Sequence, residues 1–255
     1  MINTKIKNII KSQIKRIFYT RYGKKLFESI VLEMEKECIE ALGREYNISV
    51  KYSNIKLPKT IETFEDLYFL FWCSPLNRGI IRVDLDEASY MYKLVKSLEN
   101  PVIVEIGRFK GGSTLLIASA MKGGRLISLD LHLKMMLKTE GNIYDEELKS
   151  ILKRYGVESK VEIVVADSKR FPNENLEVDF IFIDGDHSYE GVKADYEHWI
   201  DTVKRGGHIL FHDACNSRPY ATLHEGIQRL VKELKGNNTL IIANEIGSLI
   251  HFVKK

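Results

Sequence analysis

The sequence predicts an α/β fold: a mostly parallel, seven-stranded sheet with a C-terminal antiparallel hairpin, preceded by an N-terminal helical extension. Two observations predict it. From residue 101 onward, short β-branched runs alternate with helical segments, which is typical of parallel strands joined by crossover helices. The last two runs are separated only by Glu245-Ile246-Gly247, as in a hairpin. The expected strands are Val102–Glu105, Leu126–Asp130, Val161–Val165, Phe180–Asp184, His208–His212, Leu240–Asn244 and Leu249–Val253.

The overall composition is that of a globular protein with a sizeable core. The chain has 255 residues, of which 44% are hydrophobic and 29% are charged. Its three cysteines are far apart and form no C-x-x-C pair. This spacing argues against a disulfide framework or a zinc ribbon and predicts a reducing, cytoplasmic location. No apolar run reaches the roughly 18–20 residues that would span a bilayer.

Positive charge is concentrated at the N-terminus. Residues 1–25 carry eight basic and no acidic side chains, whereas the remainder has 30 basic and 35 acidic ones. The main body is therefore not predicted to bind nucleic acid. Isoleucines recur at helical spacing among the lysines and predict a basic amphipathic helix over residues 2–20. We favour packing or dimerisation through this helix, and hence a homo-oligomer, over peripheral attachment to anionic lipid.

The predicted domain boundary lies at residues 84/85. Residues 1–84 are expected to form the helical extension, with an acidic helix over 26–46 and an aromatic cluster over 64–72. Because no basic residues interleave the aromatic side chains, the cluster is expected to be core or the roof of a pocket. Residues 85–255 are expected to form the main domain, beginning with a helix over Asp86–Asn100.

Residues 101–114, which run Pro-Val-Ile-Val-Glu-Ile-Gly-Arg-Phe-Lys-Gly-Gly-Ser-Thr, carry the first functional motif. A strand ends in a carboxylate, breaks into a glycine-bearing turn and opens into the apolar helix Leu115–Met121. Glycines let a ligand approach the main chain closely. A carboxylate beside them suits a ligand with hydroxyls or positive charge, which favours S-adenosylmethionine over NAD. The candidate cofactor-binding residues here are Glu105, Gly107, Arg108, Phe109, Gly111 and Ser113.

Two further acidic residues follow the next strands. Asp130 lies 25 residues after Glu105, at the position from which a carboxylate reaches the ribose hydroxyls of an adenosine-type ligand. Its alternative role is a capping or turn aspartate. Asp167 and Ser168 end the third strand and are candidates for contact with an adenine amino group. For this pair a plain loop is nearly as well supported.

The second motif runs from Val178 to Gly191. A buried strand delivers Asp184, and His187 follows three residues later at the start of a helix. A histidine beside a carboxylate is a candidate general base. Asp213 follows the next strand, so Asp184 and Asp213 together offer oxygen ligands to a hard divalent cation.

These motifs resemble those of class I S-adenosylmethionine-dependent methyltransferases, and in particular the metal-dependent small-molecule O-methyltransferases of the antibiotic-tailoring and macrolide-sugar branch. The motifs are Glu-Ile-Gly-Arg-Phe-Lys-Gly-Gly-Ser-Thr and Ile-Asp-Gly-Asp-His-Ser-Tyr-Glu-Gly, and the likeness covers about residues 85–255. It implies a Rossmann-like sheet of seven strands and an O-methyltransferase activity.

The resemblance also implies roles for individual residues. Glu105, Gly107 and Gly111 would flank the methionine part of S-adenosylmethionine, Asp130 would bind the ribose and Asp167 the adenine. His187 would be the general base. Asp184 and Asp213 would hold a divalent metal, with Mg²⁺ expected. Phe109 stands where many members have a glycine. His212 stands where relatives usually place an acid in the metal pair, so the candidate metal set is Asp184, His212 and Asp213.

The expected acceptor is a small-molecule hydroxyl on a sugar or polyketide-like compound, covered by a flap over residues 131–147. Two alternatives remain. One is a nicotinamide-dependent oxidoreductase, because Tyr189-x-x-x-Lys193 matches the Tyr/Lys pair of short-chain dehydrogenases, although it follows the wrong strand. The other is a non-catalytic cofactor-binding or membrane-associated module of the same fold.

Overall fold

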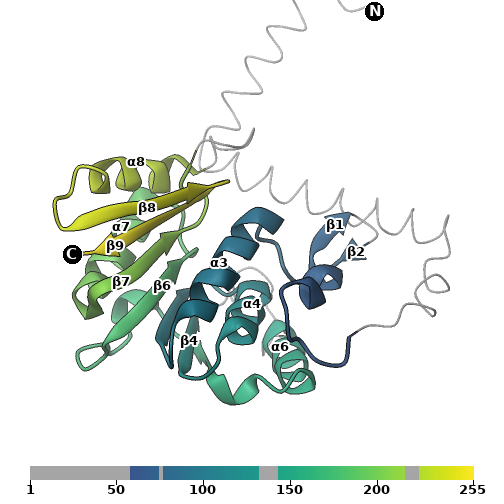
Figure 1. The fold of residues 1–255 in the computed structure, drawn as a ribbon. Helices are drawn as coiled ribbons and strands as arrows, with labels where there is room; N and C mark the ends of the chain where they lie inside the picture. The colour runs from purple at the N-terminus through teal and green to yellow at the C-terminus, as the bar shows by residue number, and fades with distance from the viewer. Residues whose placement is uncertain (1–57, 75–76, 132–142, 216–223) are drawn as a thin grey trace, which may run out of the picture. The chain divides into compact units, whose positions relative to one another are not determined.

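The structure, a computed structural model, describes residues 58–74, 77–131, 143–215 and 224–255 (Figure 1). Leu57–Trp72 and Gly79–Lys255 form one compact unit, which contains the sheet. The short strands β1 (Trp72–Ser74) and β2 (Asn77–Arg78) pair with each other in a separate two-stranded sheet. The helices predicted over residues 2–20 and 26–46 lie outside the described residues.

The main sheet has seven strands in the order β5-β4-β3-β6-β7-β9-β8, which confirms the predicted fold class. Strands β3 to β7 are parallel, and β9 pairs antiparallel with both β7 and β8. The strand order reverses between β3 and β6, where an open α/β sheet forms its ligand crevice. The strands are β3 (Val102–Ile106), β4 (Arg125–Asp130), β5 (Val161–Val165), β6 (Val178–Ile183), β7 (Val203–Phe211), β8 (Leu240–Ile246) and β9 (Leu249–Lys254).

Helices cover both faces of the sheet and bury two cores (Figure 1). On one face lie α3 (Leu85–Ser97), α4 (Gly112–Ala120) and α6 (Ile143–Arg154). On the other lie α7 (Tyr189–Trp199) and α8 (Glu225–Leu234). Successive strand side chains point to opposite faces, so Ile103 of β3 joins the first core and Val104 the second.

The aromatic segment belongs to the main unit, which differs from the predicted boundary at 84/85. Phe64, Leu67 and Phe71, around the 3-10 helix η2 (Glu65–Leu70), are buried in the core beside α3 and α4. The Phe64 ring packs edge-on against Phe71 and is tilted against Tyr92 of α3. The boundary is wrong because burial of these rings joins residues 58–71 to the domain that follows.

The predicted flap is also partly wrong. Residues 143–147 form the first turns of α6, in which Asp145 is buried, whereas residues 132–142 lie outside the described part of the chain. Strands β6 and β7 end one residue earlier than predicted. Asp184 and His212 therefore stand just beyond their strands, at the same edge of the sheet.

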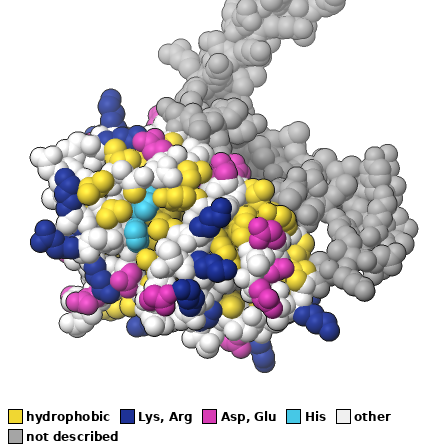
Figure 2. All heavy atoms as spheres, in the orientation of Figure 1, with side chains coloured by type: hydrophobic (Ala, Val, Ile, Leu, Met, Phe, Trp, Pro, Cys, Tyr) yellow, Lys and Arg dark blue, Asp and Glu magenta, His cyan; other side chains and the backbone are white. Residues whose placement is uncertain are grey.

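The face of the molecule drawn in Figure 2 mixes charged side chains of both signs with hydrophobic ones and shows no continuous basic surface. Within the described ranges, no helix combines the length and the apolar character needed to cross a membrane.

A chain of three aromatic polar groups links α3 to the antiparallel end of the sheet. The Tyr90 hydroxyl lies 2.7 Å from His251 Nδ1, and His251 Nε2 lies 2.9 Å from His208 Nδ1. Burial and the neighbouring His208 lower the pKa of His251 to about 4. Both imidazoles are therefore neutral in the folded protein near pH 7.

We expect the hydrogen-bonded group of Tyr90, His251 and His208 to make the stability of the fold sensitive to acid. The pKa of His251 rises from about 4 to its ordinary value of 6.5 on unfolding, so between these values the unfolded state binds the extra proton. Stability should fall as the pH falls through this window, by about 2 kcal/mol between pH 7 and pH 5 for this one group. Urea unfolding at both pH values should show a smaller loss for His251→Gln than for wild type. His198→Gln, a half-buried histidine of α7, is the control and should keep the wild-type loss. Equal losses in all three proteins would refute the assignment.

Candidate active site

The loop after β3 lies directly against the end of β6. Gly107 has a φ of +91°, and a Cβ on it would lie 2.2 Å from the carbonyl oxygen of Asp184. The Asp184 amide in turn donates to the Ile106 carbonyl (2.8 Å). Only glycine permits this close approach. The glycine loop and the second motif therefore share one edge of the sheet.

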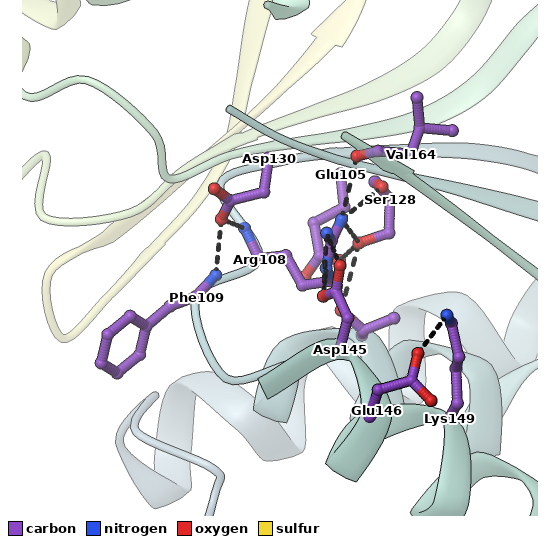
Figure 3. Close-up of polar contacts among 10 residues, drawn as sticks. Glu105, Arg108, Phe109, Ser128, Asp130, Asp145, Glu146, Lys149 and Val164 are labelled. Atoms are coloured by element: carbon purple, nitrogen blue, oxygen red, sulfur yellow. Dashed lines mark hydrogen bonds and ion pairs between the residues drawn. The ribbon is translucent and has the colours of Figure 1, made fainter. Parts of the chain in front are cut away.

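Asp130 joins the same loop from the end of β4 (Figure 3). Its Oδ2 accepts hydrogen bonds from the backbone amides of Arg108 and Phe109, both at 2.8 Å. A pyrophosphate would need these amides and would be repelled by the carboxylate. The half-buried carboxylate is instead suited to accept hydrogen bonds from sugar hydroxyls.

Arg108 does not face the crevice, contrary to its prediction as a cofactor-binding residue. Its side chain is 1% exposed and lies beneath the loop (Figure 3). Nε and Nη2 donate to the two carboxylate oxygens of Asp145 in α6, at 3.0 and 3.1 Å. Nη1 donates to the carbonyl oxygens of Ser128 and Val164, at 2.6 and 3.3 Å. The guanidinium thus ties the loop to β4, β5 and α6.

Glu105 and Ser113 are also buried beneath the loop and do not fit the predicted contact with a cofactor. Glu105 is 0% exposed, and it accepts hydrogen bonds of 2.5 Å from the hydroxyls of Ser113, Thr114 and Ser128. Burial raises the pKa of Glu105, and these hydroxyls oppose the shift. The group joins β3, α4 and β4. Gly111, with a φ of +83°, turns the chain into α4 where a Cβ would meet Leu148 of α6.

Phe109 is the exposed side chain of the loop. It is 43% exposed and has a φ of +48°, in the left-handed region that most residues avoid. Its ring lies 5.7 Å from the ring of Tyr144, and the Arg82 guanidinium lies 4.9 Å from the ring centre. The predicted contact between Phe109 and a cofactor is compatible with this position.

Asp167 and Ser168 have different positions at the end of β5. The Asp167 side chain is partly exposed and accepts a hydrogen bond from the Lys169 amide (3.1 Å), capping the 3-10 helix η4 (Ser168–Arg170). Ser168 is buried and donates to Asp195 Oδ1 of α7 (2.5 Å). The Ser168 hydroxyl holds η4 against α7, which does not fit its predicted contact with an adenine, whereas that contact of the partly exposed Asp167 stays a prediction.

The structure brings together the four residues predicted for catalysis and metal binding. His187 Nε2 lies 3.1 Å from Asp213 Oδ2 and 3.7 Å from Asp184 Oδ1. His212 Nδ1 lies 3.2 Å from Asp184 Oδ1 and 3.6 Å from Asp213 Oδ2. Asp213 has a φ of +53°, and such unusual backbone geometry is often retained at functional sites.

Two residues that the sequence analysis missed complete this cluster. Glu87 of α3 is fully buried; its Oε2 lies 3.0 Å from His212 Nε2, and its Oε1 accepts from the amide and hydroxyl of Ser248. His224, just before α8, has its Nε2 3.5 Å from Asp213 Oδ2 and its ring 4.6 Å from that of His187. No spacing in the sequence links either residue to the motifs.

The carboxylates control the protonation of the histidines. Burial opposes charge on His212, but Asp184, Asp213 and Glu87 outweigh it and raise the pKa of His212 well above its ordinary value. For His187, burial is likewise outweighed by Asp213 and Asp184, which raise its pKa. Burial lowers the pKa of His224. Both shifts favour the protonated imidazolium, and the pKa of His212 is raised more strongly than that of His187.

The predicted metal set fits this arrangement only in part. The ligand atoms of Asp184, His212 and Asp213 lie within 4.8 Å of one another. However, both His212 nitrogens lie at hydrogen-bond distance from carboxylates, of Glu87 and of Asp184. The raised pKa favours the imidazolium form of His212, in which both nitrogens carry protons and neither has a lone pair for a metal. Two carboxylates then remain, which is a small ligand set for Mg²⁺.

The fold and this edge of the sheet define an α/β domain that binds a nucleoside-type ligand in the crevice of an open sheet. The comparisons agree. The family described as "Methyltransferase domain" matches residues 104–214. A probable caffeoyl-CoA O-methyltransferase of Dictyostelium discoideum is 22% identical over 214 residues, covering 79% of this chain and 88% of the relative. The structure of an O-methyltransferase from Bacillus cereus in complex with SAH superimposes with a TM-score of 0.52 at 20% identity, covering 69% of this chain and 84% of that one.

An uncharacterized protein, R132, of Acanthamoeba polyphaga mimivirus is 30% identical over 140 residues. This alignment spans 52% of the chain and 60% of the viral protein's length. Taken with the strand order and the two motifs, these similarities identify residues 104–214 as a methyltransferase domain and support a class I S-adenosylmethionine-dependent O-methyltransferase.

We expect loss of Arg108 alone to destabilise the protein much more than simultaneous loss of Arg108 and Asp145. Arg108→Ala leaves a buried carboxylate without its partner and should cost about 3–5 kcal/mol in the free energy of unfolding. The double variant Arg108→Met/Asp145→Leu removes both charges and should regain most of that loss. Urea denaturation measures both. A small effect of Arg108→Ala would contradict the inference that the guanidinium ties the loop to β4, β5 and α6.

Proposed function

We propose that the protein transfers a methyl group from S-adenosylmethionine to a hydroxyl group of a small molecule, with His187 as the general base. One observation carries this proposal: the glycine loop and the His187 cluster share the same edge of the sheet, joined at Gly107 and Asp184. A ligand held by the loop and Asp130 would have its reactive end beside His187.

Each residue has a separate task in this reaction. S-adenosylmethionine, when bound, supplies a methyl group activated by a sulfonium. Asp130 accepts hydrogen bonds from the ribose, and the exposed ring of Phe109 lies over a ligand bound at the loop. As the acceptor oxygen forms its bond to the methyl carbon, the carbon–sulfur bond breaks and its electron pair stays on sulfur. The hydroxyl proton passes to neutral His187, and Asp213, whose Oδ2 lies 3.1 Å from His187 Nε2, stabilises the imidazolium that forms.

The loop argues against the nicotinamide alternative. The amides of Arg108 and Phe109 are bonded to Asp130 and do not form a pyrophosphate cradle. Tyr189 and Lys193 lie on α7, where the Tyr189 hydroxyl donates to Glu233 of α8 (2.9 Å). The non-catalytic alternative is opposed by the convergence of Asp184, His187 and Asp213, since such a group is costly to keep without a function.

The relatives' names favour a phenolic acceptor, whereas the sequence motifs favour a sugar or polyketide-like one. Both classes present a hydroxyl whose proton must be removed. A panel containing catechols, phenylpropanoid-CoA esters and hydroxylated sugars therefore tests the acceptor with one assay.

We expect calorimetric titration to show binding of S-adenosylhomocysteine and no binding of NAD. Asp130→Asn should weaken S-adenosylhomocysteine binding by about 10–100-fold, because it replaces a charged acceptor of hydrogen bonds. Glu162→Gln, an exposed residue of β5, is the control and should bind as wild type does. A preference for NAD would overturn the proposed function.

His187→Gln should leave S-adenosylhomocysteine affinity nearly unchanged and lower the methyl-transfer rate by about 10²–10⁴-fold, the usual contribution of a positioned base. Transfer of a labelled methyl group to the best acceptor of the panel measures the rate. His198→Gln controls for loss of a histidine elsewhere. An unchanged rate would remove His187 from the mechanism.

A further inference from the structure

We propose that methyl transfer by this protein needs no divalent metal, because His212, held by Glu87, takes the place of an ion between Asp184 and Asp213. The family resemblance implies Mg²⁺ at this position instead. The exclusion of the ion rests on the arrangement of the side chains alone, whereas the consequence for methyl transfer rests on the proposed function.

Imidazole nitrogens fill the space between the two aspartates. His187 Nε2 lies 3.1 Å from Asp213 Oδ2 and 3.7 Å from Asp184 Oδ1. His212 Nδ1 lies 3.2 Å from Asp184 Oδ1 and 3.6 Å from Asp213 Oδ2. Nitrogens and oxygens therefore alternate around a closed ring, in which each of these carboxylate oxygens faces both nitrogens. An ion that bound both oxygens would have to displace the nitrogens or bind through them.

The nitrogens of this ring are not available as ligands. His212 Nε2 lies 3.0 Å from Glu87 Oε2, and its Nδ1 lies 3.2 Å from Asp184 Oδ1. An ionised carboxylate only accepts hydrogen bonds, so a proton on each nitrogen satisfies both contacts. An imidazole with two protons has no lone pair for a metal and carries a positive charge. His187 Nε2 faces Asp213 in the same way, so the same reasoning excludes it.

Glu87 fixes His212 in this place. It is 0% exposed, and its Oε1 accepts hydrogen bonds from the amide and the hydroxyl of Ser248, at 2.6 and 3.0 Å. Its Oε2 also accepts from the Asp84 amide (3.3 Å). A buried carboxylate is costly without a positive partner, and the His212 imidazolium supplies that charge. A divalent ion brought beside the same imidazolium would be repelled by it.

The remaining donor set is poor for the implied ion. Mg²⁺ prefers octahedral coordination by oxygen. An acid at position 212 would add an oxygen ligand to Asp184 and Asp213, whereas histidine both withholds that ligand and satisfies the two carboxylates. Removal of the hydroxyl proton then depends on His187 and Asp213, which belong to the protein itself.

The first experiment measures metal binding by the full-length wild-type protein, separately from its activity. After chelator treatment, Mg²⁺ and Mn²⁺ are titrated calorimetrically, with and without S-adenosylhomocysteine. We expect no specific binding of either ion. Methyl transfer to the best acceptor of the panel should proceed at the same rate in EDTA as in Mg²⁺.

The second experiment restores the acid that the family resemblance places at position 212. The double variant His212→Asp/Glu87→Gln adds this carboxylate and removes the buried charge that would oppose it. Its matched control, His212→Asn/Glu87→Gln, has nearly the same shape without the added charge. Mn²⁺ should bind the first variant at least about tenfold more tightly than the second, since even an outer-shell change typically costs about 10–100-fold in metal affinity.

Each result either supports or overturns the exclusion of the ion. Specific binding of Mg²⁺ or Mn²⁺ to wild type would overturn it, and weakening of that binding by His212→Gln would identify His212 as a ligand oriented by Glu87. Methyl transfer that is lost in EDTA and restored by Mg²⁺ would overturn it as well. A folded His212→Asp/Glu87→Gln variant that binds Mn²⁺ no better than its control would refute His212 as the group that excludes the ion.

Failure of the proposed function gives a different pattern. If no acceptor of the panel is methylated with or without Mg²⁺, the proposed activity fails, and the calorimetric titration of wild type still decides whether an ion is excluded. Thermal unfolding without metal identifies any variant that does not fold, and the wild-type titration then decides by itself.

Discussion

The buried guanidinium of Arg108 is the constraint on which the cofactor side of the site depends. Four of its hydrogen bonds, two to Asp145 and two to backbone carbonyls, hold the loop after β3 down onto β4, β5 and α6. With the side chain fixed below, the amides of Arg108 and Phe109 point to Asp130. The loop therefore presents a carboxylate instead of an anion-binding nest, which suits a cationic, ribose-bearing ligand.

The sheet was predictable from the sequence, and its registers show why. The central strands β3, β4 and β6 are buried on both faces, so hydrophobicity alone marks their centres, whereas the edge strands β5 and β8 are partly exposed. The strand ends were less certain because they depend on pairing: β7 begins at Val203, well before the apolar run, where Val203 pairs with Val178. The segment over 64–71 was assigned to the wrong unit because only the tertiary structure shows which core its rings enter.

The site was predicted in part, and the errors share a cause. Glycine spacing located the loop, but it cannot tell which side chains of a turn point toward the ligand. Arg108 and Glu105 were therefore assigned to the cofactor, although both are buried under the loop. Glu87 and His224 were missed for a different reason. They come from α3 and the segment before α8, and only the fold brings them to His212 and Asp213.

The contact between His212 and Glu87 accounts for the presence of a histidine at one position and of a buried carboxylate at the other. An acid at position 212, the pattern expected from the family resemblance, would face the fully buried Glu87 carboxylate without a counter-charge, and this repulsion would be severe in a low-dielectric interior. Histidine can instead donate one nitrogen to Glu87 and the other to Asp184. Glu87 is held in turn by Ser248, at the turn before β9. His212, held by Glu87 on one side and Asp184 on the other, thus supplies the positive charge that a metal would provide between these two carboxylates. The accessible part of the cluster is then Asp213 with the neighbouring imidazoles of His187 and His224.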